Sequence, residues 1–103
     1  MDLLTSIRVF RQVVMRGSFT KAAEDLDMST AMASKHVTNL EQHVQARLLM
    51  RTSRRLSLTE AGQMYFDESG HALDILQQAT ANASSGAKKP KGTLKITAPG
   101  WLA

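Results

Sequence analysis

The fold is decided by residues 18–43, which read SFTKAAEDLDMSTAMASKHVTNLEQH. Small and apolar side chains recur there at helical spacing in two segments, roughly 18–26 and 30–43. A short polar break separates the two segments, and Ser29 at its end is a good N-cap residue. The stretch therefore predicts two helices joined by a tight turn, the second with a polar face opposite its apolar stripe.

Residues on both sides of this pair extend the pattern. Residues 2–15 carry an apolar stripe at steps of four and three, and Gly17 offers a C-cap. After the pair, Leu56 and Leu58 alternate with polar residues, and Leu48 and Met50 can alternate in the same way. We therefore expect a two-stranded hairpin over 48–58, a wing, with arginines at its base and tip. The predicted head is a mainly α winged helix-turn-helix over residues 1–58.

A long helix is predicted over residues 59–83. Thr59 can cap its start, and a stripe that is apolar except for Glu68 recurs along it at steps of four and three. So small a head cannot bury such a helix, and a second copy of the chain is the economical partner. The residues expected in this dimer interface are Ala61, Tyr65, Ala72, Ile75, Leu76 and Ala79.

The last twenty residues are expected to leave this helix. Residues 84–92 are rich in Ser, Gly, Lys and Pro, which predicts a hinge. Residues 93–97 alternate like a strand that has nothing to pair with, so 93–103 is interpreted as the truncated start of a second domain.

Composition narrows the class of function. The chain has no cysteine, no apolar run long enough for a membrane span and no basic-then-apolar leader, so a cytoplasmic protein is expected. Residues 1–58 carry nine Lys and Arg against five Asp and Glu, whereas residues 59–83 carry four acids and no Lys or Arg. This distribution predicts that the head meets a polyanion, although a random scatter of charge is the alternative.

Several motifs, in one order and at one spacing, strongly resemble LysR-type transcriptional regulators. They are Gly17-Ser18-Phe19-Thr20-Lys21-Ala22-Ala23-Glu24-Asp25-Leu26, Met28-Ser29, Ser34-Lys35, Leu40-Glu41, Arg47-Leu48-Leu49, Arg51-Thr52, Arg54, Leu58-Thr59-Glu60-Ala61-Gly62 and Gly92-Thr93-Leu94-Lys95-Ile96-Thr97-Ala98-Pro99.

The resemblance implies several properties of the whole protein. They are a DNA-binding head, a dimerising linker helix and a sensor domain beyond this stretch that binds a small-molecule effector. Such regulators act as dimers or pairs of dimers on interrupted palindromes near promoters, where RNA polymerase is a possible partner. No cofactor is expected in residues 1–103.

Four positions depart from the family pattern. At Gln45 the family usually has glycine, so we expect a left-handed turn with strain on the order of 1 kcal/mol. Thr30 and Ala31 stand where a glutamine followed by a proline is common, and Lys35 stands where arginine is frequent. Because these positions lie where bases would be read, the target sequence cannot be carried over.

The expected DNA contacts follow from a second helix that lies in the major groove. Base contacts are assigned to Thr30, Ala31, Ser34 and Lys35. Backbone contacts are assigned to Ser18, Thr20, Thr38, Arg51, Thr52 and Ser53. Arg54 at the wing tip is assigned to the minor groove, where negative potential is concentrated. The plain alternatives are helix-start roles for Thr30 and Ser34 and solvated charges for the lysine and arginine.

Other functions are weighed against this one. An enzyme is not expected, because the chain has no nucleophile elbow, glycine-rich phosphate loop or paired carboxylates. No metal site is expected either, because His36 and His43 share a helix face but lack a third ligand and are expected to be exposed. Arg47 is expected to pair with Glu41 rather than with DNA. The runner-up is a protein-docking module, which would need no basic wing.

Overall fold

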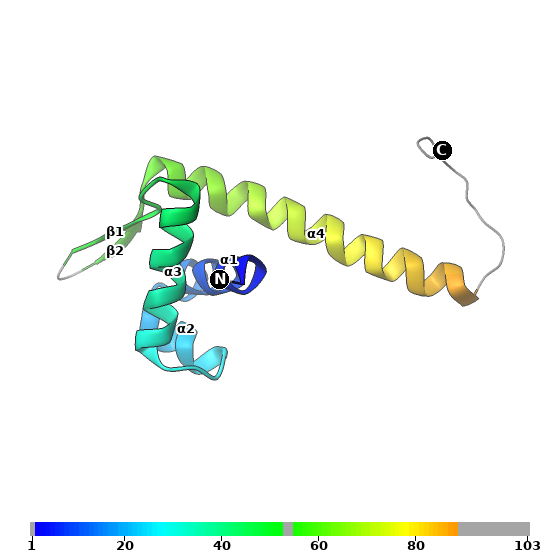
Figure 1. Cartoon of the computed structure of the whole chain (residues 1–103), viewed down its shortest axis with the longest axis horizontal. Coiled ribbons are helices and arrows are strands. Elements are labelled where there is room, and N and C mark those ends of the chain that lie inside the picture. Colours follow the sequence, from blue (N-terminus) through cyan, green and yellow to red (C-terminus); the bar gives the residue numbers. More distant parts are fainter. Residues whose placement is uncertain (1, 53–54, 89–103) are drawn as a thin grey trace. The chain divides into compact units, whose positions relative to one another are not determined.

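The part of the chain that the structure describes folds into four helices and one hairpin (Figure 1). The computed structural model describes residues 2–52 and 55–88. The elements are α1 (Leu3–Arg16), α2 (Phe19–Asp25), α3 (Thr30–Val44), β1 (Leu49–Arg51), β2 (Leu56–Leu58) and α4 (Glu60–Lys88). Two compact units divide between Ser69 and Gly70, within α4. The first unit is a winged helix-turn-helix, which confirms the predicted fold class.

Side-chain caps set where the first three helices begin. The carboxylate of Asp2, the hydroxyl of Ser18 and the hydroxyl of Ser29 each accept a hydrogen bond from a backbone N–H in the following turn. These bonds satisfy amides that a helix start leaves without an intrahelical partner. Gly17 ends α1 in the left-handed conformation, with φ +67°, as expected of a C-cap glycine.

One apolar core joins the head. Its buried members come from α1, α2, α3 and the start of the wing: Val9, Phe10, Val13, Ala22, Ala23, Ala33, Val37, Leu40, Leu48 and Leu49. The small alanines of α2 and α3 allow these helices to pack closely, which leaves the opposite side of α3 free.

The wing is a short antiparallel hairpin in which Leu49 pairs with Leu58 and Arg51 with Leu56. The expected alternation was wrong by one residue, because Leu48 and Leu49 are both buried while Met50 is 50% exposed. Leu48 precedes the strand, and the carboxylate of Glu41 holds the N–H groups of Leu48 and Leu49, so the strand period starts one residue later.

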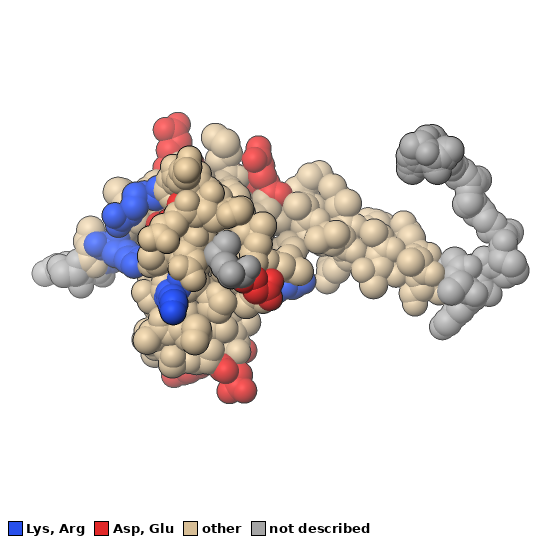
Figure 2. Space-filling view, in the orientation of Figure 1, with Lys and Arg blue, Asp and Glu red and all other residues tan. Residues whose placement is uncertain are grey.

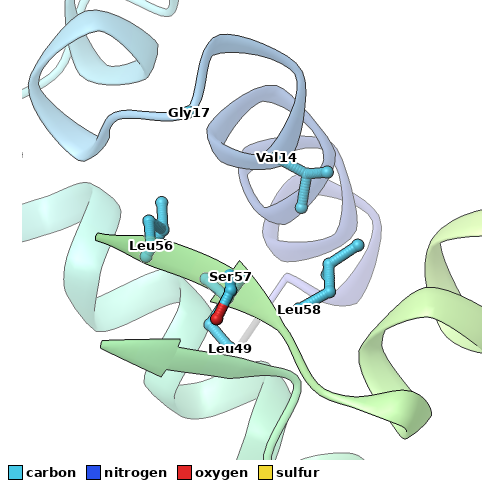
Figure 3. Close-up of a pocket in the computed structure, with 6 residues that line it drawn as sticks. All are labelled: Val14, Gly17, Leu49, Leu56, Ser57 and Leu58. Atoms are coloured by element: carbon cyan, nitrogen blue, oxygen red, sulfur yellow. The ribbon is translucent and has the colours of Figure 1, made fainter. Parts of the chain in front are cut away.

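An apolar hollow of about 180 Å³ lies between the hairpin and the end of α1 (Figure 3). Val14 of α1 faces the hollow together with leucines of both strands. Val14, Leu56 and Leu58 pack against the head core to which Leu49 belongs, so apolar burial holds the wing on the head.

The last helix begins where predicted and ends later. The hydroxyl of Thr59 accepts from the N–H of Gly62 at 2.9 Å and donates to the carbonyl of Arg47 at 2.5 Å. The helix runs to Lys88, so residues 84–88 of the predicted hinge are helical. Ser and Ala tolerate a helix, and the sequence has no proline before Pro90. The strand expected over 93–97 lies outside the described residues.

The first turns of α4 pack on the head core. Tyr65 meets Phe10 edge-to-face with ring centroids 6.0 Å apart, and burial raises the pKa of the Tyr65 phenol. The guanidinium of Arg11 donates to the hydroxyl of Ser69 at 3.1 Å and stacks on the Phe66 ring. Over the described ranges, no helix has both the length and the apolar character that a bilayer crossing requires.

Candidate nucleic-acid interface

The outer face of α3 carries the residues predicted to read bases. Ala33, Val37 and Leu40 are buried on one side of this helix. Each residue turns a helix by about 100°, so Ala31 and Lys35 lie on the opposite side, where both are exposed. Thr30 is exposed as well, whereas Ser34 and Thr38 are half-buried on the flank. The sequence pattern therefore identified a real polar face at the start of α3.

Thr30 is not the N-cap of α3. Ser29 performs this role, because its hydroxyl accepts from the N–H of Met32 at 3.0 Å. Met32 is itself 46% exposed, so an apolar side chain that sequence reasoning left unassigned lies in the same first turn. The beginning of α3 thus presents short polar and apolar side chains, the kinds that suit base edges and thymine methyl groups.

A groove lies between the start of α2 and the wing. It has a volume of about 290 Å³ and is lined by Gly17, Ser18, Phe19, Arg51, Thr52, Arg55 and Leu56. The predicted backbone contacts Ser18, Arg51 and Thr52 therefore line one groove, and Thr20 is exposed on the first turn of α2. Arg55 lies there too.

Two of the predicted hydroxyl contacts have structural roles. Ser18 accepts from the N–H of Lys21 at 3.1 Å as the cap of α2. Thr52 accepts from the N–H of Arg55 at 3.0 Å and donates to its carbonyl at 2.9 Å, which links the residue after β1 to the residue before β2. Their side chains therefore shape the groove. Ser53 and Arg54, predicted at the wing tip, lie outside the described residues.

Positive charge gathers where the hairpin and α3 lie (Figure 2). Arg51 lines the groove between α2 and the wing, and its guanidinium carbon lies 4.9 Å from the centre of the Phe19 ring. A cation over an aromatic face is held by the ring quadrupole. Its orientation is therefore constrained, and the groove presents a positive group.

Glu41 is the residue of this region whose full role the sequence reasoning missed. Its side chain is only 12% exposed, and it lies 4.0 Å from Arg47, the pair that the sequence predicted, and 3.8 Å from Arg51. Its Oε2 also accepts from the N–H groups of Leu48 and Leu49. Arg47, six positions after Glu41 in the sequence, was the available signal for an ion pair, but the contact with the strand start depends on the tertiary fold.

The histidines have no common site. Nδ1 of His36 lies 3.0 Å from the hydroxyl of Ser6 and ties α3 to α1, so the expectation that His36 is exposed was wrong. His43 is exposed. Among the residues that the structure describes, no three His, Cys, Asp or Glu side chains converge as metal ligands would.

The predicted dimer face divides into two groups. Ala61 and Tyr65 are half-buried against the head core. Ala72, Ile75, Leu76 and Ala79 are exposed on the second unit, where Ile75 is 56% and Leu76 53% exposed. The second group is therefore the one that a partner can cover.

Comparison with known proteins identifies a family to which this chain is similar. Residues 4–63 match the family described as bacterial regulatory helix-turn-helix protein, lysR family. A transcriptional repressor of Pseudomonas aeruginosa is 42% identical over 93% of the chain, and the transcriptional activator AaeR of Escherichia coli is 38% identical over 93%. The chain covers 30% and 31% of these two proteins. It thus spans about a third of the length of the relatives it matches.

Solved structures of a DNA-binding domain bound to DNA are similar to this chain as well. The DNA-binding domain of BenM in complex with catB site 1 DNA aligns with 91% of this chain and 100% of its own, at 30% identity and a TM-score of 0.78. The same domain on benA site 1 DNA aligns with 86% of the chain at a TM-score of 0.80.

Proposed function

Because this chain belongs to the lysR family of bacterial regulatory helix-turn-helix proteins, we propose that it binds double-stranded DNA sequence-specifically and regulates transcription. Its relatives are transcriptional regulators and not enzymes, in agreement with the sequence prediction. The observation that carries the proposal is an exposed polar start of α3 together with a groove that contains two arginines, both within one compact unit.

In this proposal α3 enters the major groove and the wing follows the backbone and minor groove. Thr30, Ala31, Ser34 and Lys35 contact base edges, with Lys35 acting as a point charge and not as a bidentate fork. Ser18, Thr20, Thr38, Arg51, Thr52 and Ser53 position the head on phosphates, and Arg54 enters the minor groove. The hydroxyl of Ser18 keeps its proton for a phosphate oxygen, whereas the hydroxyl of Thr52 donates to the carbonyl of Arg55 and would have to release it to reach a phosphate.

The whole protein would act as a homodimer on a palindromic operator. Two-fold symmetry in the protein matches two half-sites on the duplex, and the exposed apolar residues of α4 supply a surface for pairing. A domain beyond residue 103 would bind a small-molecule effector, and tetramers and contact with RNA polymerase would belong to that longer protein. We expect it to act in the cytoplasm.

Selection of bound duplexes from a random pool tests this function and reads the half-site at once. The enriched sequences should contain an interrupted palindrome, and affinity should fall steeply with salt because cations on the protein displace counterions from phosphates. Lys35→Ala should weaken binding by about 1–3 kcal/mol if the contact is to a base. Arg8→Ala, which removes an exposed charge on α1, is the matched control and should change affinity little.

The alternative is a protein-docking module. It predicts that the purified chain ignores every duplex at low salt and that Lys35→Ala and Arg8→Ala behave alike. Either result would remove α3 from the role of recognition helix.

A further inference from the structure

Glu41 occupies the junction between α3 and the wing. One carboxylate oxygen accepts from the N–H groups of Leu48 and Leu49 at 2.8 and 3.1 Å, and the other lies 3.8 Å from Nη2 of Arg51. A single side chain therefore contacts both the start of the first strand and a guanidinium of the wing. Because it is 12% exposed, water screens these contacts only weakly.

Arg51 is held from two directions. Glu41 of α3 lies at one side of the guanidinium, and the ring of Phe19 of α2 lies beneath it. The side chain remains 34% exposed and lines the groove between α2 and the wing. Arg51 is therefore both constrained and accessible, the combination that favours binding an anion without further ordering.

We propose that Glu41 is a positioning residue for DNA binding, which acts by holding Arg51 toward a backbone phosphate. The inference rests on the proposed function and deepens it. A free arginine loses rotamer freedom when it binds, whereas a guanidinium already held by a carboxylate and a ring loses less. The planar group still has N–H donors for a phosphate oxygen while it faces Glu41.

This role predicts the opposite effect on DNA affinity from the one that charge alone predicts. An acidic residue near DNA repels phosphates, so its neutralisation should tighten binding and steepen the salt dependence. Glu41→Gln separates the two effects. The amide oxygen can still accept from Leu48 and Leu49, but the amide nitrogen is a donor and cannot hold the Arg51 guanidinium.

The experiment measures the affinity of the 103-residue chain for one duplex selected from the random pool, over a series of salt concentrations. Glu41→Gln should weaken binding about 5- to 10-fold, the scale of one charge-assisted contact. Its logarithmic salt slope should become shallower by about one, because one cation no longer reaches a phosphate. Glu24→Gln adds the same charge at an exposed position of α2 and should leave affinity unchanged or slightly raised.

A double-mutant cycle identifies the route of the effect. In an Arg51→Gln background, Glu41→Gln should change affinity by less than about 2-fold, because the residue through which it acts is gone. An equal loss in both backgrounds, with an unchanged salt slope, would mean that Glu41 only supports the wing and would overturn the proposal. Equal or tighter binding by Glu41→Gln would overturn it as well.

Phe19→Leu provides a second test of the positioning role, because it changes no charge. It keeps apolar packing but removes the ring beneath Arg51, and binding should weaken while circular dichroism still reports a folded head. Unchanged affinity in this variant would contradict the two-sided hold on Arg51. If the wild-type chain binds no duplex at all, the proposed function fails, whereas binding that is insensitive to these variants refutes only the positioning role.

Discussion

At the scale of single residues, Gln45 occupies a backbone conformation that suits glycine better. It caps α3 with φ 58° and ψ 44°, in the left-handed region. A side chain costs about 1–2 kcal/mol there, while glycine adds flexibility to the unfolded chain. Gln45→Gly should therefore raise the free energy of unfolding by about 0.5–1 kcal/mol, measured by urea titration.

Gln42→Gly provides the matched control for this change. Gln42 is exposed on α3 and lies in the helical conformation, so glycine should cost about 1 kcal/mol there. Equal effects of the two glycines would mean that the left-handed cap stores no strain.

Asp2 makes the stability of α1 depend on acidic pH. Hydrogen bonds from the side chain and then the backbone of Thr5 hold the pKa of the Asp2 carboxyl below its ordinary value of 3.8. The charged form is therefore favoured in the folded state. Its contribution is present above that ordinary value and is lost as the pH falls through the lower folded pKa.

Asp2→Asn isolates this contribution because asparagine caps a helix without titrating. The loss of stability on acidification should be smaller in the variant than in the wild type, when both are unfolded by urea at a series of pH values. A carboxyl NMR titration that gives Asp2 an ordinary pKa would contradict the role of the Thr5 hydrogen bonds in this pH dependence.

At the scale of elements, α4 and the start of the wing approach closely at Gly62. A Cβ built there would lie 2.0 Å from the carbonyl oxygen of Leu48 and 2.9 Å from Cδ2 of Leu58. The same carbonyl accepts from the N–H of Thr59 at 3.0 Å, so the strand start cannot retreat freely.

Gly62→Ala should therefore destabilise the head by about 2 kcal/mol, since overpacking outweighs the gain of about 1 kcal/mol in helix propensity. Thermal and urea unfolding measure the loss. Met64→Ala, at a position 57% exposed two residues further along α4, should change stability little. A neutral or stabilising Gly62→Ala would show that α4 can shift away from the wing without cost.

The elements themselves were largely predictable because local signals mark them. Ser29 and Thr59 lie before apolar stripes of helical period, and the structure uses both as caps. The start of the wing was not predictable from local pattern. Leu48 and Leu49 are both buried because a distant carboxylate, on Glu41, holds their backbone amides. Tertiary contacts of this kind leave no periodic trace in the sequence.

The candidate site was likewise predictable only in part. Periodicity placed Ala31 and Lys35 on the outer face of α3, because the opposite stripe is apolar. It could not show that Phe19 lies beneath Arg51, since these residues are 32 positions apart in the sequence and meet only in the folded head. The groove between α2 and the wing is therefore a property of the fold.

At the scale of the whole molecule, the proposed pairing would use the second unit. Residues 75–85 of α4 carry no charged side chain and are exposed, and Ile75 and Leu76 are its large apolar members. A charge buried in an apolar seam is costly, so Leu76→Glu should convert a dimer into a monomer. Sedimentation of the chain measures this directly.

Gln77→Glu is the matched control, because it adds the same charge at the next position. A helix turns about 100° per residue, so Gln77 points away from the side that carries Ile75 and Leu76. The Gln77→Glu variant should remain a dimer. On a palindromic duplex, the Leu76→Glu monomer should bind more weakly, because its two heads no longer share one binding event. On a duplex with a single half-site, both variants should bind alike, since each head keeps its own α3 and wing. If Leu76→Glu stays dimeric, the seam lies on another face of α4.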